Sequence, residues 1–471
     1  MLFPTIEFFV FFILVFTGTW ALNSFNAVKK LVLLAASYFF YAQWNVYFIF
    51  LLAAASCWNF AIGYAIARLR GRPSERAVLA AGVIGNLGLL GYFKYYDFVS
   101  VQIFNFFALW NLQVDFGSTG LALPVAISFL AFHGISYIVD VHREKTKASN
   151  SLVDVMLYMA FFPHLVAGPI VRAAEFMPQL ATPRDPASIK LGASLVLIIG
   201  GLIKKVVIAG HISQSLVDPV FVAPGSCSSL DLFAAAVGYA VVIYCDFSGY
   251  TDIAIGIANL LGYEFPPNFA QPYRALSLQE FWRRWHITLS NWLKDYVYIP
   301  LGGSHKGVTS TYRNLILTMV LGGLWHGAGA QFLIWGGLHG VGLAVERFLA
   351  RNSKASTGLS FVEILLRWTA TFGFVTLAWI FFRASSLDIA LEFISGLASS
   401  EIVGTRLTPL LAALVVSGML LHIAPVSLYQ TAGARLEALP SFVQSVFLIL
   451  AIWCICVFAP LGVPPFIYFQ F

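Results

Sequence analysis

Charged residues are scarce in this chain. Asp, Glu, Lys and Arg supply 11% of its 471 residues and 59% are hydrophobic, whereas soluble domains carry about 25% charged residues. No long polar stretch interrupts the sequence, so its length does not indicate several soluble domains. Apolar runs of about twenty residues, enough to cross roughly 30 Å of hydrocarbon, recur from end to end. The sequence therefore predicts one all-α integral membrane domain over residues 1–471.

Several motifs with defined chemistry are also missing. The five cysteines are scattered without a CxxC pair, which gives no disulfide framework. The sequence has no P-loop, no GxGxxG before a helix and no GxSxG elbow, which excludes ATP-driven pumps, dinucleotide enzymes and ordinary hydrolases. No two histidines have the HExxH spacing, so no metal is expected. The net charge of +6 is not gathered into a basic face with stacking aromatics, so no nucleic acid is expected.

The apolar runs predict about eleven or twelve membrane spans. Among the first five, the connections alternate between basic segments and segments without basic residues. By the positive-inside rule, this alternation places the N-terminus outside the cytoplasm. The tail of the fourth run, "GYFKYYDF", is predicted to bend or to lie at the interface. The runs are 4–25, 28–43, 46–67, 77–110, 121–141, 152–167, 190–212, 230–262, 313–349, 361–382, 408–424 and 443–463.

Prolines break the middle of the chain. Pro163 lies near the end of the sixth run, Pro169, Pro178, Pro183 and Pro186 follow it, and the segment 263–275 contains three more. Broken helices at membrane depth are tolerated only where protein or a water-filled cavity surrounds them. We therefore expect re-entrant or interfacial helices around a cavity. The absence of an internal repeat argues against transporters built from two related halves.

The segment 276–304, "LSLQEFWRRWHITLSNWLKDYVYIPLGGS", combines aromatic and basic residues. Ser277 and Glu280 form a capping box, which predicts the start of a helix. Steps of three and four would place aromatic residues on one face of this helix and basic residues on another. Such a helix either lies at the interface with its bases on anionic lipid or binds the phosphates of an acyl donor. The residues expected on the basic face are Arg283, His286, Ser290 and Lys294.

The stretch 321–340, "LGGLWHGAGAQFLIWGGLHG", places His326 among glycines. Small neighbours let another helix or a substrate approach closely, and burial would keep the imidazole neutral, as a general base requires. The alternative is a packing histidine bonded to a carbonyl. On one continuous helix His339 would face elsewhere, about 220° around the axis, and we expect it to be structural. His133 is expected to be a buried hydrogen-bonding group.

Two acids, Asp246 and Asp252, lie within the apolar segment 244–263. Intramembrane acids line the ion paths of transporters, so they favour a secondary transporter as the rival interpretation. They could equally cap helices or hold Lys and Arg side chains in place. We favour the structural role.

Five stretches carry a resemblance to a known family. In chain order they are "FFPHLVAGPIVR" (161–172), "DFSGYTDIAIG" (246–256), "NFAQPYRALSLQEFWRRWHITLSNWLKDYVYIPLGG" (268–303), "YRNLILTMVLGGLWHGAG" (312–329) and "AWIFFRA" (378–384). The chain resembles the membrane-bound O-acyltransferase (MBOAT) family, in the bacterial branch that contains alginate O-acetyltransferase and the D-alanyl transfer protein of teichoic acid. The resemblance implies an irregular ring of helices around a central funnel. Its signature core covers about 120–385, with further spans at about 405–465.

The resemblance also implies an activity. His326 matches the catalytic histidine of the family and His286 its second signature position. The basic face inferred above would then bind the donor through Arg283, Ser290 and Lys294. The donor is expected to be cytoplasmic acetyl-CoA, with no permanently bound cofactor. The chain would lie in the bacterial inner membrane with a periplasmic N-terminus, beside a polysaccharide synthase or export complex and a periplasmic SGNH-type partner. Alginate- or cellulose-like polymers are the expected acceptors, with peptidoglycan O-acetylation or D-alanyl transfer as alternatives.

Overall fold

The computed structural model of the chain describes residues 3–112, 117–352, 358–398, 405–460 and 462. Within these ranges the regular secondary structure is helical and contains no β-strand, which confirms the predicted all-α class. The contacts fall into two compact units, Met1–Lys190 with Ile257–Pro266 (unit 1) and Leu191–Gly256 with Pro267–Phe471 (unit 2). The prediction of a single membrane domain stays a prediction.

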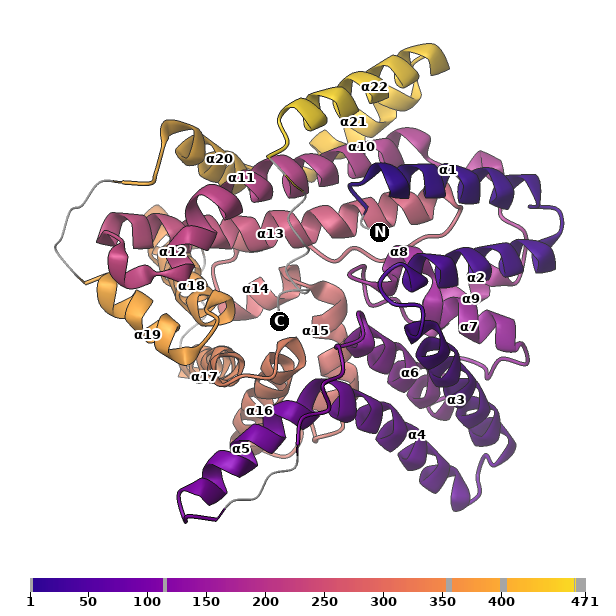
Figure 1. Cartoon of the computed structure of the whole chain (residues 1–471), viewed down its shortest axis with the longest axis horizontal. Helices are drawn as coiled ribbons and strands as arrows, with labels where there is room; N and C mark the ends of the chain where they lie inside the picture. The colour runs from indigo at the N-terminus through magenta and orange to yellow at the C-terminus, as the bar shows by residue number, and fades with distance from the viewer. Residues whose placement is uncertain (1–2, 113–116, 353–357, 399–404, 461, 463–471) are drawn as a thin grey trace. The chain divides into compact units, whose positions relative to one another are not determined.

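Unit 1 is built from the N-terminal helices, shown in indigo and magenta in Figure 1. Helix α3 packs on α4, α6 and α7, and α2 packs on α7. A π-helical turn, Gly91–Tyr95, interrupts the fourth apolar run between α4 and α5, where the sequence predicted a bend. The helices are α1 (Ile6–Ala21), α2 (Asn26–Ala42), α3 (Phe48–Arg68), α4 (Ser74–Leu90), α5 (Tyr96–Ala108), α6 (Ile127–His142), α7 (Leu152–Ala160), α8 (Phe162–Leu165) and α9 (Ala173–Leu180).

His133 of α6 lies in the core of unit 1. The residue is fully buried, and its ring centroid is 4.8 Å from that of His164. Neither ring nitrogen of His133 has a hydrogen-bond partner among the described residues. The expectation that it is buried is confirmed, and the expectation that its ring is hydrogen-bonded is wrong.

Unit 2 contains the helices that position the candidate site. Helix α10 approaches α13 closely, because a Cβ on Gly201 would lie 2.6 Å from the carbonyl oxygen of Gly249. Helices α16 and α17 pack along each other, and α18 packs on α17. The helices are α10 (Leu191–Leu202), α11 (Gly210–Ile212), α12 (Asp218–Val222), α13 (Ser229–Leu260), α14 (Leu278–Arg284), α15 (Ile287–Leu293), α16 (Val308–His326), α17 (Ala330–Asn352), α18 (Phe361–Arg383), α19 (Leu387–Gly396), α20 (Pro409–Leu420), α21 (Val426–Glu437) and α22 (Ser441–Val457).

Six helical segments of the described chain are long and apolar enough to cross a membrane, and shorter apolar helices accompany them. The chain is therefore a multi-pass membrane protein, while the count of eleven or twelve spans stays a prediction. The six are Phe48–Arg68, Ser74–Ala108, Leu191–Val222, Ser229–Leu260, Ala330–Arg351 and Phe361–Arg383. Two positions of the predicted run 443–463, residues 461 and 463, lie outside the described residues.

The predicted run 313–349 is two helices instead of one. Helix α16 ends at His326, and the next residue, Gly327, has extended backbone angles (φ −160°, ψ 153°). Helix α17 then begins at Ala330. The turn between them contains Gly327 and Gly329. The glycines around His326 therefore end helix α16, in addition to letting a neighbouring helix pack closely.

Candidate active site

Residues 278–293 form two short helices, and the predicted continuous helix is wrong. As predicted, the Oγ of Ser277 caps the first helix by accepting a hydrogen bond from the backbone N–H of Glu280 at 3.0 Å. Helix α14 ends at Arg284, Trp285 is extended, and His286 has left-handed backbone angles (φ 41°, ψ 56°) before α15 begins. A non-glycine residue in this region is strained by about 1–3 kcal/mol, and such residues cluster at functional sites.

The break separates the residues that were expected to share one basic face. Arg283 and Lys294 are exposed, whereas His286 is fully buried. Ser290 is half-buried, and its hydroxyl donates to the carbonyl of Trp285 at 3.3 Å. Because the helix is interrupted at Trp285 and His286, the four side chains do not share one helix face. Donor binding by Arg283, Ser290 and Lys294 stays a prediction without this geometric support.

A buried asparagine, which the sequence reasoning missed, holds the backbone at the break. The carbonyl of Asn268 accepts a hydrogen bond from the N–H of Ile287 at 2.9 Å. Its side-chain Oδ1 accepts from the N–H of Thr288 at 3.1 Å and from the hydroxyl of Thr288 at 2.8 Å. The same oxygen lies 3.1 Å from Nδ1 of His286. Asn268 is 1% exposed, so this polar cluster is fully enclosed.

These contacts fix the tautomer of His286. A backbone N–H can only donate, so the Asn268 atom that faces Thr288 must be the acceptor oxygen rather than the amide nitrogen. Nδ1 of His286 faces that oxygen and therefore carries the ring proton. Nε2 is left with a lone pair, is buried, and has no hydrogen-bond partner among the described residues. The ring thus presents a bare acceptor nitrogen, which is the form that can take a proton.

Burial also keeps this ring uncharged. His286 lies between α14 and α15, outside the helices that are long and apolar enough to span a membrane. Burial lowers the pKa of His286 to about 3, because the charged imidazolium loses its hydration. The side chain is therefore neutral at physiological pH.

His326 ends α16 and is enclosed by aromatic rings. It is 4% exposed, and its ring centroid lies 4.8 Å from Trp325, 5.0 Å from Phe382 and 5.1 Å from Trp335. The ring of Trp325 is also 6.2 Å from that of His286. The two histidines predicted to be catalytic therefore contact the same indole from different elements of unit 2.

Glycines hold α16 and α17 close together behind His326. A Cβ on Gly323 would overlap the carbonyl oxygen of Phe332, and a Cβ on Gly336 would overlap that of Met319. At Gly327 a Cβ would overlap the ring of Phe332. The prediction that glycine lets a neighbouring helix approach the backbone near His326 is confirmed at these positions.

His339 lies closer to this cluster than the helical wheel suggested. The wheel assumed one continuous helix, but α16 ends at His326 and α17 returns beside it, so the expectation that His339 faces elsewhere is wrong. Its ring is 4.9 Å from Trp335, which also contacts His326. Nδ1 of His339 accepts a hydrogen bond from the indole N–H of Trp282 at 3.2 Å. Buried and bonded within an aromatic cluster, His339 fits the structural role expected for it.

The intramembrane acids of α13 are paired with lysines. Asp252 forms an ion pair with Lys204, and Asp246 forms one with Lys205. The side chains of Lys205 and Asp246 are 2% and 8% exposed, so this pair is buried and its charges are compensated. The arrangement matches the structural role expected of the acids and weakens the transporter interpretation.

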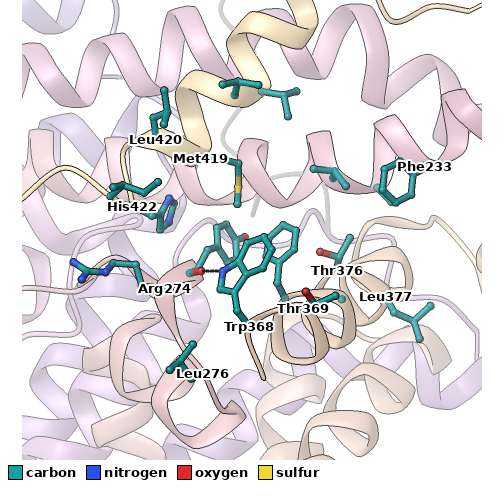
Figure 2. A pocket seen from close by; sticks show the side chains of 18 of the residues that line it. Phe233, Arg274, Leu276, Trp368, Thr369, Thr376, Leu377, Met419, Leu420 and His422 are labelled. Atoms are coloured by element: carbon teal, nitrogen blue, oxygen red, sulfur yellow. Dashed lines mark hydrogen bonds between the residues drawn. The ribbon is translucent and has the colours of Figure 1, made fainter. Parts of the chain in front are cut away.

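Two cavities are described within unit 2, and neither is lined by His286 or His326. One lies between α13, α18 and α20 (Figure 2), and the other lies beside the ends of α16 and α17. A route for a donor to His326 therefore stays a prediction. Across the described ranges, no group of three or more His, Cys, Asp or Glu residues is placed to hold a metal ion.

The fold and the site define a multi-pass helical membrane protein with two enclosed histidines, one of them neutral and with a fixed tautomer. Comparison with known proteins defines the class further. Residues 141–387, which include both histidines and Asn268, match the family model of MBOAT, the membrane-bound O-acyltransferase family. The chain belongs to this family and is a membrane-bound O-acyltransferase.

Individual relatives have related activities. The chain is 37% identical, over the full length of both proteins, to the probable alginate O-acetylase AlgI of Pseudomonas putida. It is 39% identical to the peptidoglycan O-acetyltransferase of Helicobacter pylori, over 78% of this chain and 73% of that protein. It is 28% identical to the teichoic acid D-alanyltransferase of Streptococcus thermophilus, over 50% of this chain and 60% of that protein. By their names, the first acetylates alginate, the second acetylates peptidoglycan, and the third transfers D-alanyl groups to teichoic acid.

Proposed function

We propose that this chain transfers acetyl groups from cytoplasmic acetyl-CoA across the bacterial inner membrane for O-acetylation of an extracellular polysaccharide. The observation that carries the proposal is that the enclosed rings of His286 and His326 both lie near the indole of Trp325. Acyl transfer to a hydroxyl needs a neutral base and a site shielded from water. His326, enclosed by the rings of Trp325, Trp335 and Phe382, is the candidate for the base, and the neutral ring of His286 near the same indole offers an acceptor nitrogen beside it.

In the proposed reaction, the acceptor hydroxyl attacks the thioester carbonyl. The hydroxyl proton passes to His326, the carbon–oxygen bond forms, and the carbon–sulfur bond breaks. The proton then passes from His326 to the leaving CoA thiolate, which balances the step. The tautomer of His286 restricts its role, because neutral Nε2 has no hydrogen to donate to an oxyanion. His286 therefore orients the donor or the acceptor by accepting a hydrogen bond.

The relatives support the choice of polymer, and the partner is part of the proposal. The similarity to an alginate O-acetylase supports alginate or a similar polysaccharide, such as a cellulose-like polymer, as the acceptor, while the identity to a peptidoglycan O-acetyltransferase is comparable over a smaller share of the chain. A periplasmic SGNH-type protein would complete transfer to the sugar hydroxyl, and an N-terminus in the periplasm would suit that arrangement. D-alanyl transfer is the weaker alternative, because that relative is less similar and covers half of this chain.

The test measures release of CoA from acetyl-CoA by the purified protein with its periplasmic acceptor. His326→Ala is expected to abolish release and to retain the native elution profile. The matched control is His305→Ala, since His305 is exposed and its recorded hydrogen bond uses only the backbone N–H. Full turnover by His326→Ala would overturn the assignment of the base. Full turnover by both His326→Ala and His286→Ala would overturn the proposed function.

A further inference from the structure

Unit 2 contains an apolar groove that the proposed reaction does not use. The groove has a volume of about 1150 Å³ and is lined by side chains of α13, α18 and α20 (Figure 2). Phe233 and Leu377 lie toward one end of the groove, and Met419 and Leu420 of α20 lie above it. Because α13 and α18 are membrane-spanning segments, a groove with this lining can accommodate a hydrocarbon chain.

The opposite end of the groove is positively charged. Arg274, Arg284 and Glu280 line it, so two positive charges and one negative charge leave a net charge of +1. The carboxylate of Glu280 pairs with Arg284 at 2.8 Å. Arg274 is exposed, and its recorded partner is the neutral side-chain oxygen of Gln271 at 2.9 Å. The guanidinium of Arg274 is therefore the charge that remains for a ligand at this end.

A tryptophan of α18 is hydrogen-bonded next to the charged end of the groove. The indole N–H of Trp368 donates to the carbonyl of Tyr273, next to Arg274, at 2.9 Å, and Figure 2 shows Trp368 in the groove. Tryptophan and arginine side chains gather where hydrocarbon meets headgroups. From Trp368 to Ile380, which also lines the groove, α18 rises ~18 Å at 1.5 Å per residue. That distance is close to the depth of one leaflet, about half of a 30 Å core.

Two buried polar atoms line the groove without a partner among the described residues. Nδ1 of His422 is 3.3 Å from the carbonyl of Gly418, so Nδ1 donates and Nε2 is left as a bare acceptor. Nε2 of His422 and Oγ1 of Thr376 have no hydrogen-bond partner. The two residues are 2% and 9% exposed. An unsatisfied polar atom of His422 beside Arg274 would be satisfied by a ligand that brings polar atoms of its own, as the glycerol and ester region of a phospholipid does.

We propose that the groove between α13, α18 and α20 binds an anionic phospholipid, with its phosphate on Arg274 and one acyl chain along α18. The net positive end favours an anionic headgroup over a zwitterionic one. The groove depth matches a single leaflet, and His422 lies near Arg274 (Figure 2), where the ester region would pass. This site does not involve His286 or His326, so it stands or falls independently of the proposed reaction.

The test uses the full chain in phosphatidylcholine nanodiscs with a tracer of phosphatidylglycerol that carries a photoactivatable group on one acyl chain. Illumination is expected to label peptides of α13, α18 and α20. A phosphatidylcholine tracer with the same chain is expected to label them about fivefold less, the equivalent of ~1 kcal/mol for one arginine near the membrane surface. Arg274→Gln is expected to remove the difference between the two tracers. Equal labelling by both tracers in the unsubstituted chain would overturn the proposal.

Filling the groove tests its location. A Cβ at Gly373 would meet no atom within 4 Å, and Gly373 lines the groove, so Gly373→Leu adds bulk there without a backbone clash. The matched control is Gly200→Leu, a helical glycine of α10 that also has open space around its Cβ. Gly373→Leu is expected to reduce labelling to the level of the zwitterionic tracer, with CoA release unchanged, and Gly200→Leu is expected to leave labelling intact. Undiminished labelling of Gly373→Leu would refute the groove as the site. Competition by excess glycerol phosphate would show a phosphate site without a lipid chain and would also refute the proposal.

Discussion

The tautomer of His286 gives a direct test of how the site works, through the asparagine that sets it. In Asn268→Ala, the Nδ1–H of His286 and the N–H of Thr288 lose the oxygen that they share at 3.1 Å. Both donors lie in a region where Asn268 is 1% exposed, so water replaces the oxygen poorly. Each buried donor left unpaired costs about 1–3 kcal/mol. We therefore expect the variant to lose about 2–4 kcal/mol of stability, taken as the sum for two such donors at the lower part of that range.

The effect on catalysis is separable from the loss of stability. Without the oxygen, the ring proton of His286 is no longer held on Nδ1, and the preference for a bare Nε2 falls by about one neutral hydrogen bond, ~1.4 kcal/mol. A change of that size shifts the ratio of the two tautomers about tenfold, so the competent tautomer falls from a large majority to about half of the enzyme and kcat/KM is expected to fall about twofold. Asn268→Asp keeps an acceptor oxygen at this position, so it is expected to retain more activity than Asn268→Ala at neutral pH.

The pH profile distinguishes a catalytic effect from a purely structural one. The pKa of His286 is about 3, against an ordinary value of 6.5, so the unfolded chain binds this proton between those values and the folded chain does not. The contribution to stability is complete above about pH 6.5 and is lost as the pH falls toward 3. In Asn268→Asp a neighbouring carboxylate raises the pKa of His286.

CoA release by Asn268→Asp is therefore expected to fall on acidification from pH 7 to 5, while the unsubstituted chain shows no loss from this residue. The assay is initial-rate CoA release normalised to folded protein. If Asn268→Ala loses stability but keeps its full normalised kcat/KM, the reasoning from the tautomer is wrong.

Two further predictions concern the packing that supports the site. Gly323→Ala is expected to destabilise the protein by about 1–3 kcal/mol and to lower turnover, because its Cβ would overlap the carbonyl oxygen of Phe332. The control is Gly337→Ala, which has open space around its Cβ. Equal melting temperatures for the two variants would contradict the packing argument. Lys205→Met is expected to cost about 3–5 kcal/mol, because the carboxylate of Asp246 stays buried without its lysine, and adding Asp246→Leu is expected to recover most of the loss in thermal unfolding. If the double variant is no more stable than Lys205→Met, the unpaired carboxylate of Asp246 is not the cause of the lost stability, and the structural role assigned to this ion pair is wrong.

The long helices could be predicted because their cause is local. The segment 230–262 was expected as one apolar run, and α13 spans Ser229–Leu260, since nothing within it interrupts the hydrogen-bond ladder. The bend expected in "GYFKYYDF" appears as the π-helical turn Gly91–Tyr95. The hairpin at Gly327 was missed because its glycines were interpreted only as packing residues. A glycine after the last helical residue is also an end signal, so the information was present in the sequence.

The break at His286 could not have been found from periodicity. Trp285 and His286 are not helix breakers, and the steps of three and four continue through them. The cause is Asn268, eighteen positions before His286, which captures the backbone N–H groups of Ile287 and Thr288. A contact over that separation depends on tertiary packing, so a helical wheel does not contain it. The pairing of Asp246 with Lys205 is hidden for the same reason.

The two histidines share a feature that bears on their function. Each occupies a point where a helix is interrupted, His286 in a left-handed turn and His326 at the last position of α16. A residue inside a regular helix has its backbone bonded to the turns on either side, whereas an interrupted helix frees N–H and carbonyl groups beside the side chain. Such irregular backbone persists at membrane depth only where protein or a cavity satisfies it. Asn268 maintains the strained backbone at His286, and glycines allow the close approach of helices at His326. A regular helix at either place would need neither feature. The interruptions are best explained by the need to place two imidazoles against Trp325, where a helix alone would hold them apart.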